Sequence, residues 1–136
     1  MPARFLLDTD IFIFIRRRHL PHLQARFEKL RPDEAVMSLV TYGELRYGAE
    51  KHVNRVAGLK TIEQLATLIP VLPMGPEVAE DYAVLRAELE KSGTIIGNND
   101  LWIAAHALAE GLSLVTNKER EFRRVPGLKV QNWAVP

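Results

Sequence analysis

The sequence RFLLDTD, at residues 4–10, indicates the fold. Its first half, residues 4–7, predicts a short strand because it is a brief apolar run that ends at a turn-forming acid. The triplet at residues 8–10 is typical of a strand end followed by a helix cap, so we expect a helix next. Residues 11–15 fit a strand by propensity alone, but the cap favours the helix. A strand leading directly into a helix is the first unit of an alternating α/β pattern.

The rest of the chain repeats this alternation. Further strands are expected at residues 35–38, 68–72, 112–115 and 128–131. Helices are expected at residues 21–30, at residues 39–51 with Ser38 as the cap, at residues 77–91, and from Asn98 or Asn99 to Gly111. Short strands separated by helices predict an α/β fold with a central parallel sheet.

Composition limits the class of protein. The chain has 136 residues, 47% apolar and 26% charged, which suits a single globular domain of residues 1–136. It contains no cysteine, so disulfides and thiolate zinc sites are excluded. The longest apolar stretch, residues 10–15, is far shorter than the roughly 20 residues that a membrane helix needs. We therefore expect a cytoplasmic protein with no membrane contact.

Basic residues form clusters although the formal net charge is only +1. They lie at residues 16–18, at Lys118 with Arg120, and at residues 123–124. Each cluster could contact the phosphates of a nucleic acid or could be a solvated face, and both interpretations stay open.

Acidic residues are the strongest functional signal. Ligands bind beyond the carboxyl ends of parallel strands, and we expect four acids to converge there: Asp8, Glu44, Asp100 and Glu121. Two carboxylates about 4 Å apart repel by about 4 kcal/mol at an effective dielectric constant near 20, so such a group needs cations or protons. Oxygen ligands without His or Cys suit Mg²⁺ or Mn²⁺, and a pair of such ions could hydrolyse a phosphodiester. Taken singly, an Asp after a strand is equally well explained as a turn former or cap, and an acid at a helix start often interacts with the helix dipole. Glu44, between Tyr42 and the apolar Leu45, is the more unusual of the four.

Histidine and tryptophan give weaker signals. The four histidines show no paired metal spacing, and we expect His106 to be a packed or hydrogen-bonded side chain. Trp102 and Trp133 are expected to lie in the core.

Four stretches in this order resemble PIN-domain ribonucleases, specifically the VapC toxins of bacterial toxin–antitoxin pairs. They are LLDTD at residues 6–10, VTYGELRYGAEK at 40–51, IGNNDLWIAAHA at 96–107 and LVTNKEREFRRVPGL at 114–128. No single motif is decisive, but the ordered set covers nearly the whole chain and is specific.

The resemblance implies a three-layer α/β/α PIN fold with a central parallel sheet, and Mg²⁺- or Mn²⁺-dependent endoribonuclease activity on tRNA or another structured RNA. It also implies a VapB antitoxin that blocks the site, a homodimer, and higher hetero-oligomers with the antitoxin that bind their own promoter DNA. By this resemblance Asp8 and Asp100 match the principal metal ligands, and Glu44 and Glu121 match the acids that complete the site. Thr116 matches a hydroxyl that lines it.

Two positions depart from the family pattern. Family members more often carry Asn at the position of Asp10, so the chain has an extra acid of undefined role. Some members place an acid at or beside Lys118, which makes Glu119 a rival to Glu121 for the fourth carboxylate. We favour Glu121 because Phe122 follows it, and this Glu-Phe pair is part of the resemblance.

Two alternatives remain. The sequence FLLDTD also resembles the first motif of haloacid-dehalogenase-type phosphatases, in which one Asp attacks phosphorus and the second handles the proton, here Asp8 and Asp10. That motif continues with Gly and then Thr or Val, whereas Ile11 and Phe12 follow here. The other alternative is a catalytically decayed module that binds RNA or an antitoxin.

Overall fold

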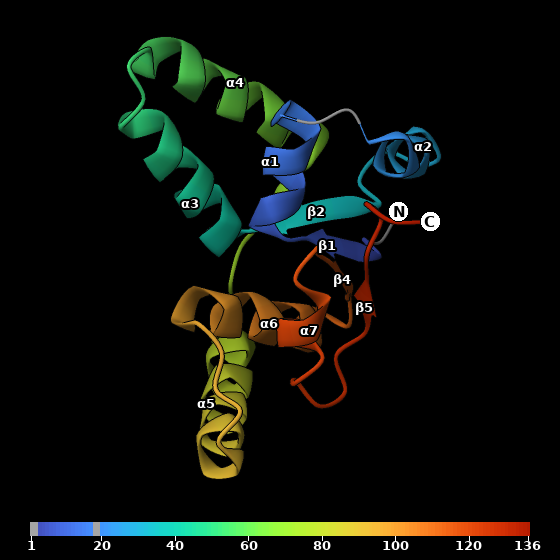
Figure 1. Ribbon diagram of the computed structural model, residues 1–136. Helices are drawn as coiled ribbons and strands as arrows, with labels where there is room; N and C mark the ends of the chain where they lie inside the picture. The colour runs from blue at the N-terminus through green and yellow to red at the C-terminus, as the bar shows by residue number, and fades with distance from the viewer. Residues whose placement is uncertain (1–2, 18–19) are drawn as a thin grey trace.

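The computed structural model describes residues 3–17 and 20–136 (Figure 1). Strands and helices alternate in the order β1 (Phe5–Leu7), α1 (Thr9–Arg17), α2 (Pro21–Glu28), β2 (Ala35–Ser38), α3 (Leu39–Glu50), α4 (Arg55–Leu68), β3 (Val71–Leu72), α5 (Pro76–Ser92), α6 (Asn98–Glu110), β4 (Ser113–Val115), α7 (Glu119–Phe122) and β5 (Val130–Gln131). The basic cluster predicted at residues 16–18 lies outside the described side chains.

The strands form one five-stranded sheet in the order β3-β2-β1-β4-β5, and every pair is parallel. Strand β1 is central, with Leu6 beside Val36 of β2 on one side and Leu114 of β4 on the other. The predicted α/β fold with a central parallel sheet is confirmed.

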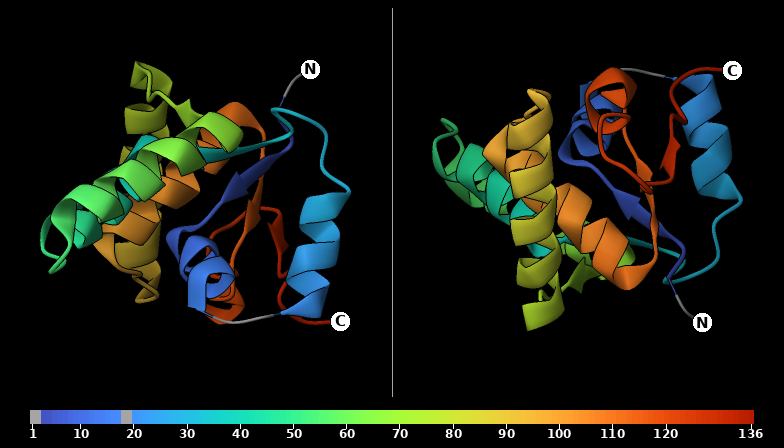
Figure 2. Two further views of the ribbon diagram at one scale, coloured as in Figure 1. Left: turned by 90° about the horizontal axis from the view of Figure 1, so that it is seen from above. Right: turned by 90° about the horizontal axis from the view of Figure 1, so that it is seen from below.

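Helices cover both faces of the sheet, which gives three layers (Figure 1). Successive strand residues point to opposite faces, so Phe5 and Leu7 pack with the core of α1 to α4, while Leu6 packs with the core of α5 and α6. Both views in Figure 2 show α2 at one side of the molecule and α3, α4 and α5 at the other, with the strands between them. Trp133 is buried against the ring of Phe5, with the ring centroids 5.0 Å apart, as expected for a core residue.

Residues 11–15 are helical, as the cap predicted. The Ile11 amide donates to the Asp8 carbonyl at 3.1 Å and so closes the first turn. Ile11 and Phe12 are fully buried, whereas Ile13 and Ile15 are each 42% exposed. The apolar residues of this segment therefore lie on two faces of one helix, and the face that carries Ile11 and Phe12 packs on the sheet.

Several predicted boundaries were wrong. The strand expected at residues 68–72 begins only at Val71, because α4 continues through Leu68. Helix α6 begins at Asn98, but its N-cap is Gly97 and no side chain caps it, so neither Asn98 nor Asn99 is the cap. Glu121 lies in the short helix α7, which was not among the helices expected from the sequence. In residues 3–17 and 20–136, none of the helices has the length and apolar character needed to cross a membrane.

Candidate active site

Asp8 lies where β1 ends, at the carboxyl edge of the sheet and beside the end of β4. Its side chain is fully buried. The Thr9 amide donates to Asp8 Oδ1 at 2.8 Å, and the Thr116 hydroxyl donates to Asp8 Oδ2 at 2.8 Å. Because Thr116 directly follows β4, the pairing of β1 with β4 fixes this contact. The predicted lining hydroxyl thus holds Asp8 in a single orientation.

Burial and a neighbouring acid make the negative charge of Asp8 costly. Burial, together with the nearby charge of Asp10, raises the pKa of Asp8 to about 7. With a pKa of about 7, Asp8 is about half protonated at neutral pH, and a bound cation would favour its charged form.

Asp10 is part of the same site, which gives the extra acid a location. It lies in the first turn of α1, and the Asn117 amide donates to its Oδ2 at 3.0 Å. Its other oxygen, Oδ1, is buried and accepts no hydrogen bond of ordinary geometry from the residues that the structure describes. Burial raises the pKa of Asp10 as well. A buried carboxylate oxygen without a donor is suited to a cation.

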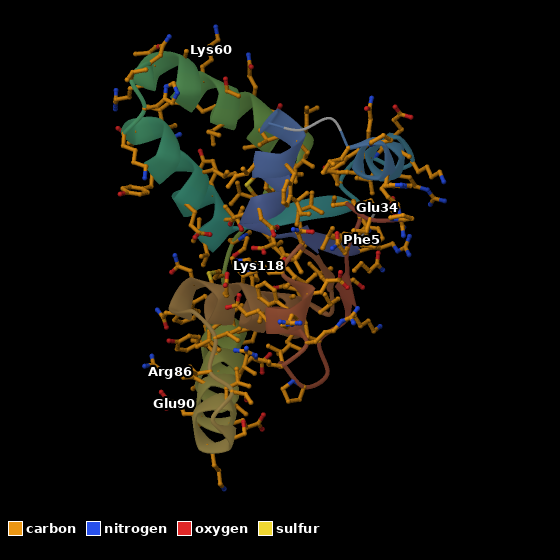
Figure 3. All side chains as sticks on the ribbon, in the orientation of Figure 1. Phe5, Glu34, Lys60, Arg86, Glu90 and Lys118 are labelled. Carbon is orange, nitrogen blue, oxygen red and sulfur yellow. The ribbon has the colours of Figure 1, made fainter. Side chains whose placement is uncertain are left out.

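Lys118 supplies a positive charge between the acids. Its ammonium lies 2.9 and 3.0 Å from the two carboxylate oxygens of Asp100, and 3.7 Å from Asp8 Oδ2. Figure 3 shows Lys118 near the middle of the molecule, where the two helical layers meet. Burial alone would lower the pKa of Lys118, but the carboxylates of Asp8 and Asp100 outweigh this effect and raise the pKa. The structure therefore brings Asp8 and Asp100 together around one ammonium group.

Glu44 reaches the site through two polar neighbours. The Thr9 hydroxyl donates to Glu44 Oε1 at 2.6 Å, and the Asn99 amide group donates to Oε2 at 3.3 Å. Thr9 is adjacent to Asp8, and Asn99 is adjacent to Asp100. These contacts aim the Glu44 carboxylate at the space that the two aspartates border. Neither Thr9 nor Asn99 was predicted from the sequence to be a site residue, although each is directly adjacent to a predicted metal ligand.

Glu121 and Glu119 occupy different environments. The Gly97 amide donates to Glu121 Oε1 at 3.3 Å. A Cβ atom at Gly97 would lie 4.0 Å from this same oxygen and 3.7 Å from Asp100 Oδ2, so Glu121 and Asp100 are neighbours. Glu119 instead forms an ion pair with Arg123 at 2.7 Å and accepts from Asn132 at 2.8 Å. These contacts favour Glu121 over Glu119.

Asp8 and Asp100 share the Lys118 ammonium, whereas Glu44 is linked to Thr9 and Asn99, and Glu121 to Gly97. Within the described part of the chain, no group of three or more His, Asp or Glu side chains is arranged to hold a metal ion. A metal ion held by these acids would therefore require side-chain movement. The donor set fits Mg²⁺ or Mn²⁺, because it consists of carboxylate oxygens, and the neighbouring Asp10 adds a buried oxygen, Oδ1, that accepts no hydrogen bond of ordinary geometry from the described residues.

Two other features lie apart from the acids. His106 is fully buried and its Nδ1 lies 2.8 Å from the Ser38 hydroxyl, as expected for a packed histidine, and burial lowers its pKa. A pocket of about 680 Å³ is lined mainly by apolar side chains of α2 and α4, and none of the four acids lines it. We define this as the apolar pocket, with Leu23, Phe27 and Leu68 among its lining residues.

Together, the parallel α/β/α fold and the carboxylate group at the carboxyl edge of its sheet define a class, that of metal-dependent hydrolases. Comparison with known proteins identifies the family within this class. The PIN domain family matches residues 5–128. Ribonuclease VapC2 of Haemophilus influenzae is 38% identical over 130 residues, which cover 96% of this chain and 98% of that protein.

Two further comparisons point to the same family. The tRNA(fMet)-specific endonuclease VapC of Salmonella typhimurium is 37% identical over 130 residues, covering 96% of this chain and 98% of that protein. The crystal structure of DNA-bound VapBC from Salmonella typhimurium superposes with a TM-score of 0.89 at 36% identity, covering 96% of this chain and 98% of that one.

The chain belongs to the PIN-domain family of metal-dependent nucleases and, within it, to the VapC ribonucleases of toxin–antitoxin pairs. The predicted resemblance is confirmed, and the phosphatase alternative is set aside.

Proposed function

We propose that this chain, as a single domain of residues 1–136, is a toxin endoribonuclease whose catalytic residues are Asp8, Glu44, Asp100 and Glu121. Asp8 and Asp100 are the residues that hold the metal. The observation that carries the assignment is that the buried Asp8 carboxylate and Asp100 face each other across a single ammonium group. Such an arrangement needs positive charge, and a divalent ion supplies it.

The metal is Mg²⁺ or Mn²⁺. When bound, such an ion makes a coordinated water acidic and stabilises negative charge at the scissile phosphodiester. The protein's own contribution is orientation. Thr116 and the Thr9 amide fix Asp8, Thr9 and Asn99 fix Glu44, and the Gly97 amide fixes Glu121. Pre-oriented ligands bind a metal with less loss of side-chain freedom.

The substrate is a structured RNA, and tRNA is the specific proposal. It is supported by the Salmonella typhimurium relative, which is named a tRNA(fMet)-specific endonuclease. Arg120 is exposed on α7, two residues after Lys118, and can contact RNA phosphates. Cleavage takes place in the cytoplasm, where that RNA is found.

The partner is a VapB-type antitoxin. The protein forms a homodimer that joins with the antitoxin in higher hetero-oligomers, and the complex binds its own promoter. The DNA-bound complex from Salmonella typhimurium supports this proposal. We place the antitoxin on the apolar pocket because its lining is mainly apolar and two of its side chains, Leu68 (76% exposed) and Ile15 (42% exposed), are open to a partner. Ile15 of α1 also lines the pocket, and α1 begins beside Asp8, so a bound segment can extend to the acids.

Cleavage of tRNA by the purified chain tests the activity. Wild-type protein should cut total tRNA internally in Mg²⁺ or Mn²⁺, and Asp8→Asn and Asp100→Asn should each lose at least about a hundredfold in rate, because each removes a ligand charge. Asp33→Asn is the matched control, since Asp33 is exposed and has a φ of 64°, which Asn tolerates. Undiminished cutting by either site variant, or by wild type in excess chelator, would contradict the assignment. No cutting by soluble wild-type protein would point to the decayed module.

A further inference from the structure

Lys118 holds a place in the acid site that the hydrolytic reaction alone does not explain. Its ammonium contacts both oxygens of Asp100 and lies 3.7 Å from Asp8 Oδ2. Asp8 is fully buried and the Asp100 side chain is only 16% exposed, so water screens these ion pairs poorly. This contact therefore differs from a surface salt bridge, which contributes little.

The backbone and alkyl chain of Lys118 are well anchored. Its amide donates to the Thr116 hydroxyl at 2.9 Å, and that same hydroxyl donates to Asp8. The ammonium lies 5.6 Å from the ring centroid of the buried Phe122. These contacts direct the side chain toward the carboxylates. Because 39% of the side chain is exposed, its end can still turn outward into solvent.

The carboxylate oxygens that contact Lys118 are the ones that a metal would use. Mg²⁺ binds oxygen at about 2.0 to 2.1 Å with near-octahedral geometry. An ammonium that contacts both oxygens of Asp100 occupies the space between them, and two cations a few ångströms apart repel each other strongly. The ammonium and the metal therefore compete for the same site.

We propose that Lys118 is a resident cation that a divalent metal ion has to displace from Asp100 and Asp8. In the metal-free protein it offsets the repulsion between these acids. After displacement, its ammonium lies at the rim of the site, where an RNA phosphate can bind it. RNA that engages Lys118 then strengthens metal binding, and by reciprocity bound metal strengthens RNA binding. The inference rests on the proposed function, since it takes Asp8 and Asp100 as the metal ligands.

Metal affinity measured without RNA tests this role separately from catalysis. Calorimetric titration of Mn²⁺ into chelator-treated protein should give a dissociation constant about tenfold lower for Lys118→Met than for wild type, a difference of about 1.4 kcal/mol. Lys118→Arg keeps the charge and should bind Mn²⁺ no more tightly than wild type. Lys60→Met is the matched control, because Lys60 is exposed on α4, far from Lys118 (Figure 3), and should match wild type. The Mn²⁺ concentration that half-saturates RNA cleavage should fall for Lys118→Met by a smaller factor, because RNA that engages Lys118 already favours metal binding in the wild type.

The possible results of these titrations distinguish failure of the Lys118 proposal from failure of the proposed function. If Lys118→Met binds Mn²⁺ as wild type does, or more weakly, while Asp8→Asn abolishes binding, the resident-cation role is overturned and the metal site stands. If wild-type protein binds no Mn²⁺, the metal site fails and the inference fails with it. Should Lys118→Met not fold, Lys118→Gln gives the same comparison with a shorter neutral side chain.

Discussion

Replacing Asp8 by Asn should remove a specific pH dependence of stability in the metal-free protein. The folded structure raises the pKa of Asp8 from the ordinary value of 3.8 to about 7, mainly through burial and then through Asp10. Between these two values the folded state holds a proton that the unfolded state has released. Stability from this group is therefore fully present below about pH 4 and is lost as the pH rises through about 7.

The size of the effect follows from the shift. One pKa unit corresponds to 1.36 kcal/mol, so a rise of about three units corresponds to about 4 kcal/mol in total. Between pH 5 and pH 8, this group alone should lower the free energy of unfolding by about 2.5 kcal/mol. His106 acts in the opposite direction, because burial lowers its pKa and its stabilising effect is lost as the pH falls. The informative quantity is therefore the difference between wild type and Asp8→Asn, in which His106 cancels.

Urea unfolding followed by tryptophan fluorescence measures this difference, because Trp133 is buried. Wild type, Asp8→Asn and the control Asp33→Asn should be compared in chelator from pH 5 to pH 8. We expect wild type and Asp33→Asn to lose stability relative to Asp8→Asn as the pH rises. Parallel profiles for all three proteins would refute the reasoning, because they would mean that Asp8 is ionised in the folded protein throughout this range.

Three further outcomes are expected. Thr116→Val removes the hydrogen bond to Asp8 and should lower the free energy of unfolding by about 1 to 3 kcal/mol in urea denaturation at pH 5. The cleavage rate should fall as well, and an unchanged rate would show that Thr116 does not orient Asp8. Neutralising Arg120 and Arg124 should reduce the slope of log RNA affinity against log salt, measured by filter binding, by about 0.7 for each phosphate that the variant no longer binds. An unchanged slope would mean that these two arginines lie on a solvated surface and do not contact RNA. Expression of the chain alone should stop bacterial growth, and co-expression of an antitoxin that supplies an arginine to the acids should restore it, since an arginine can bind carboxylates through two hydrogen bonds; normal growth at confirmed soluble levels would count against a toxin.

Much of the fold could be predicted from local pattern. Strand β2 was predicted with its observed bounds, and Ser38 caps α3 by accepting from the Val40 amide at 3.1 Å, as expected. Such features depend on a few neighbouring residues. The end of α4 could not be predicted in this way, because Leu68 is apolar and suits a strand as well as a helix. The tertiary packing of α4 against α3 decided its state.

The site was harder to predict because its parts come from distant segments. The acids could be identified by residue type and by their position after strands. The two residues that hydrogen-bond Glu44, Thr9 and Asn99, could not be identified in this way. They are ordinary polar residues in the sequence, and only the folded structure brings them beside Glu44. From the sequence, Lys118 was expected either to contact nucleic-acid phosphates or to lie on a solvated face, whereas the turn after β4 directs it onto Asp100. The assignment of catalytic roles to the acids stays a prediction until the variants are measured.

The central position of β1 also bears on how the protein is made in the cell. The strand that precedes Asp8 pairs with β4, more than a hundred residues later in the chain, and the ring of Phe5 packs on Trp133. Synthesis on the ribosome proceeds from the N-terminus, so Asp8 emerges long before Thr116 and Lys118. A nascent chain interrupted before β4 carries Asp8 but neither of these partners. We therefore expect RNA cleavage only from chains that have been translated beyond Lys118, and none from products that end before β4.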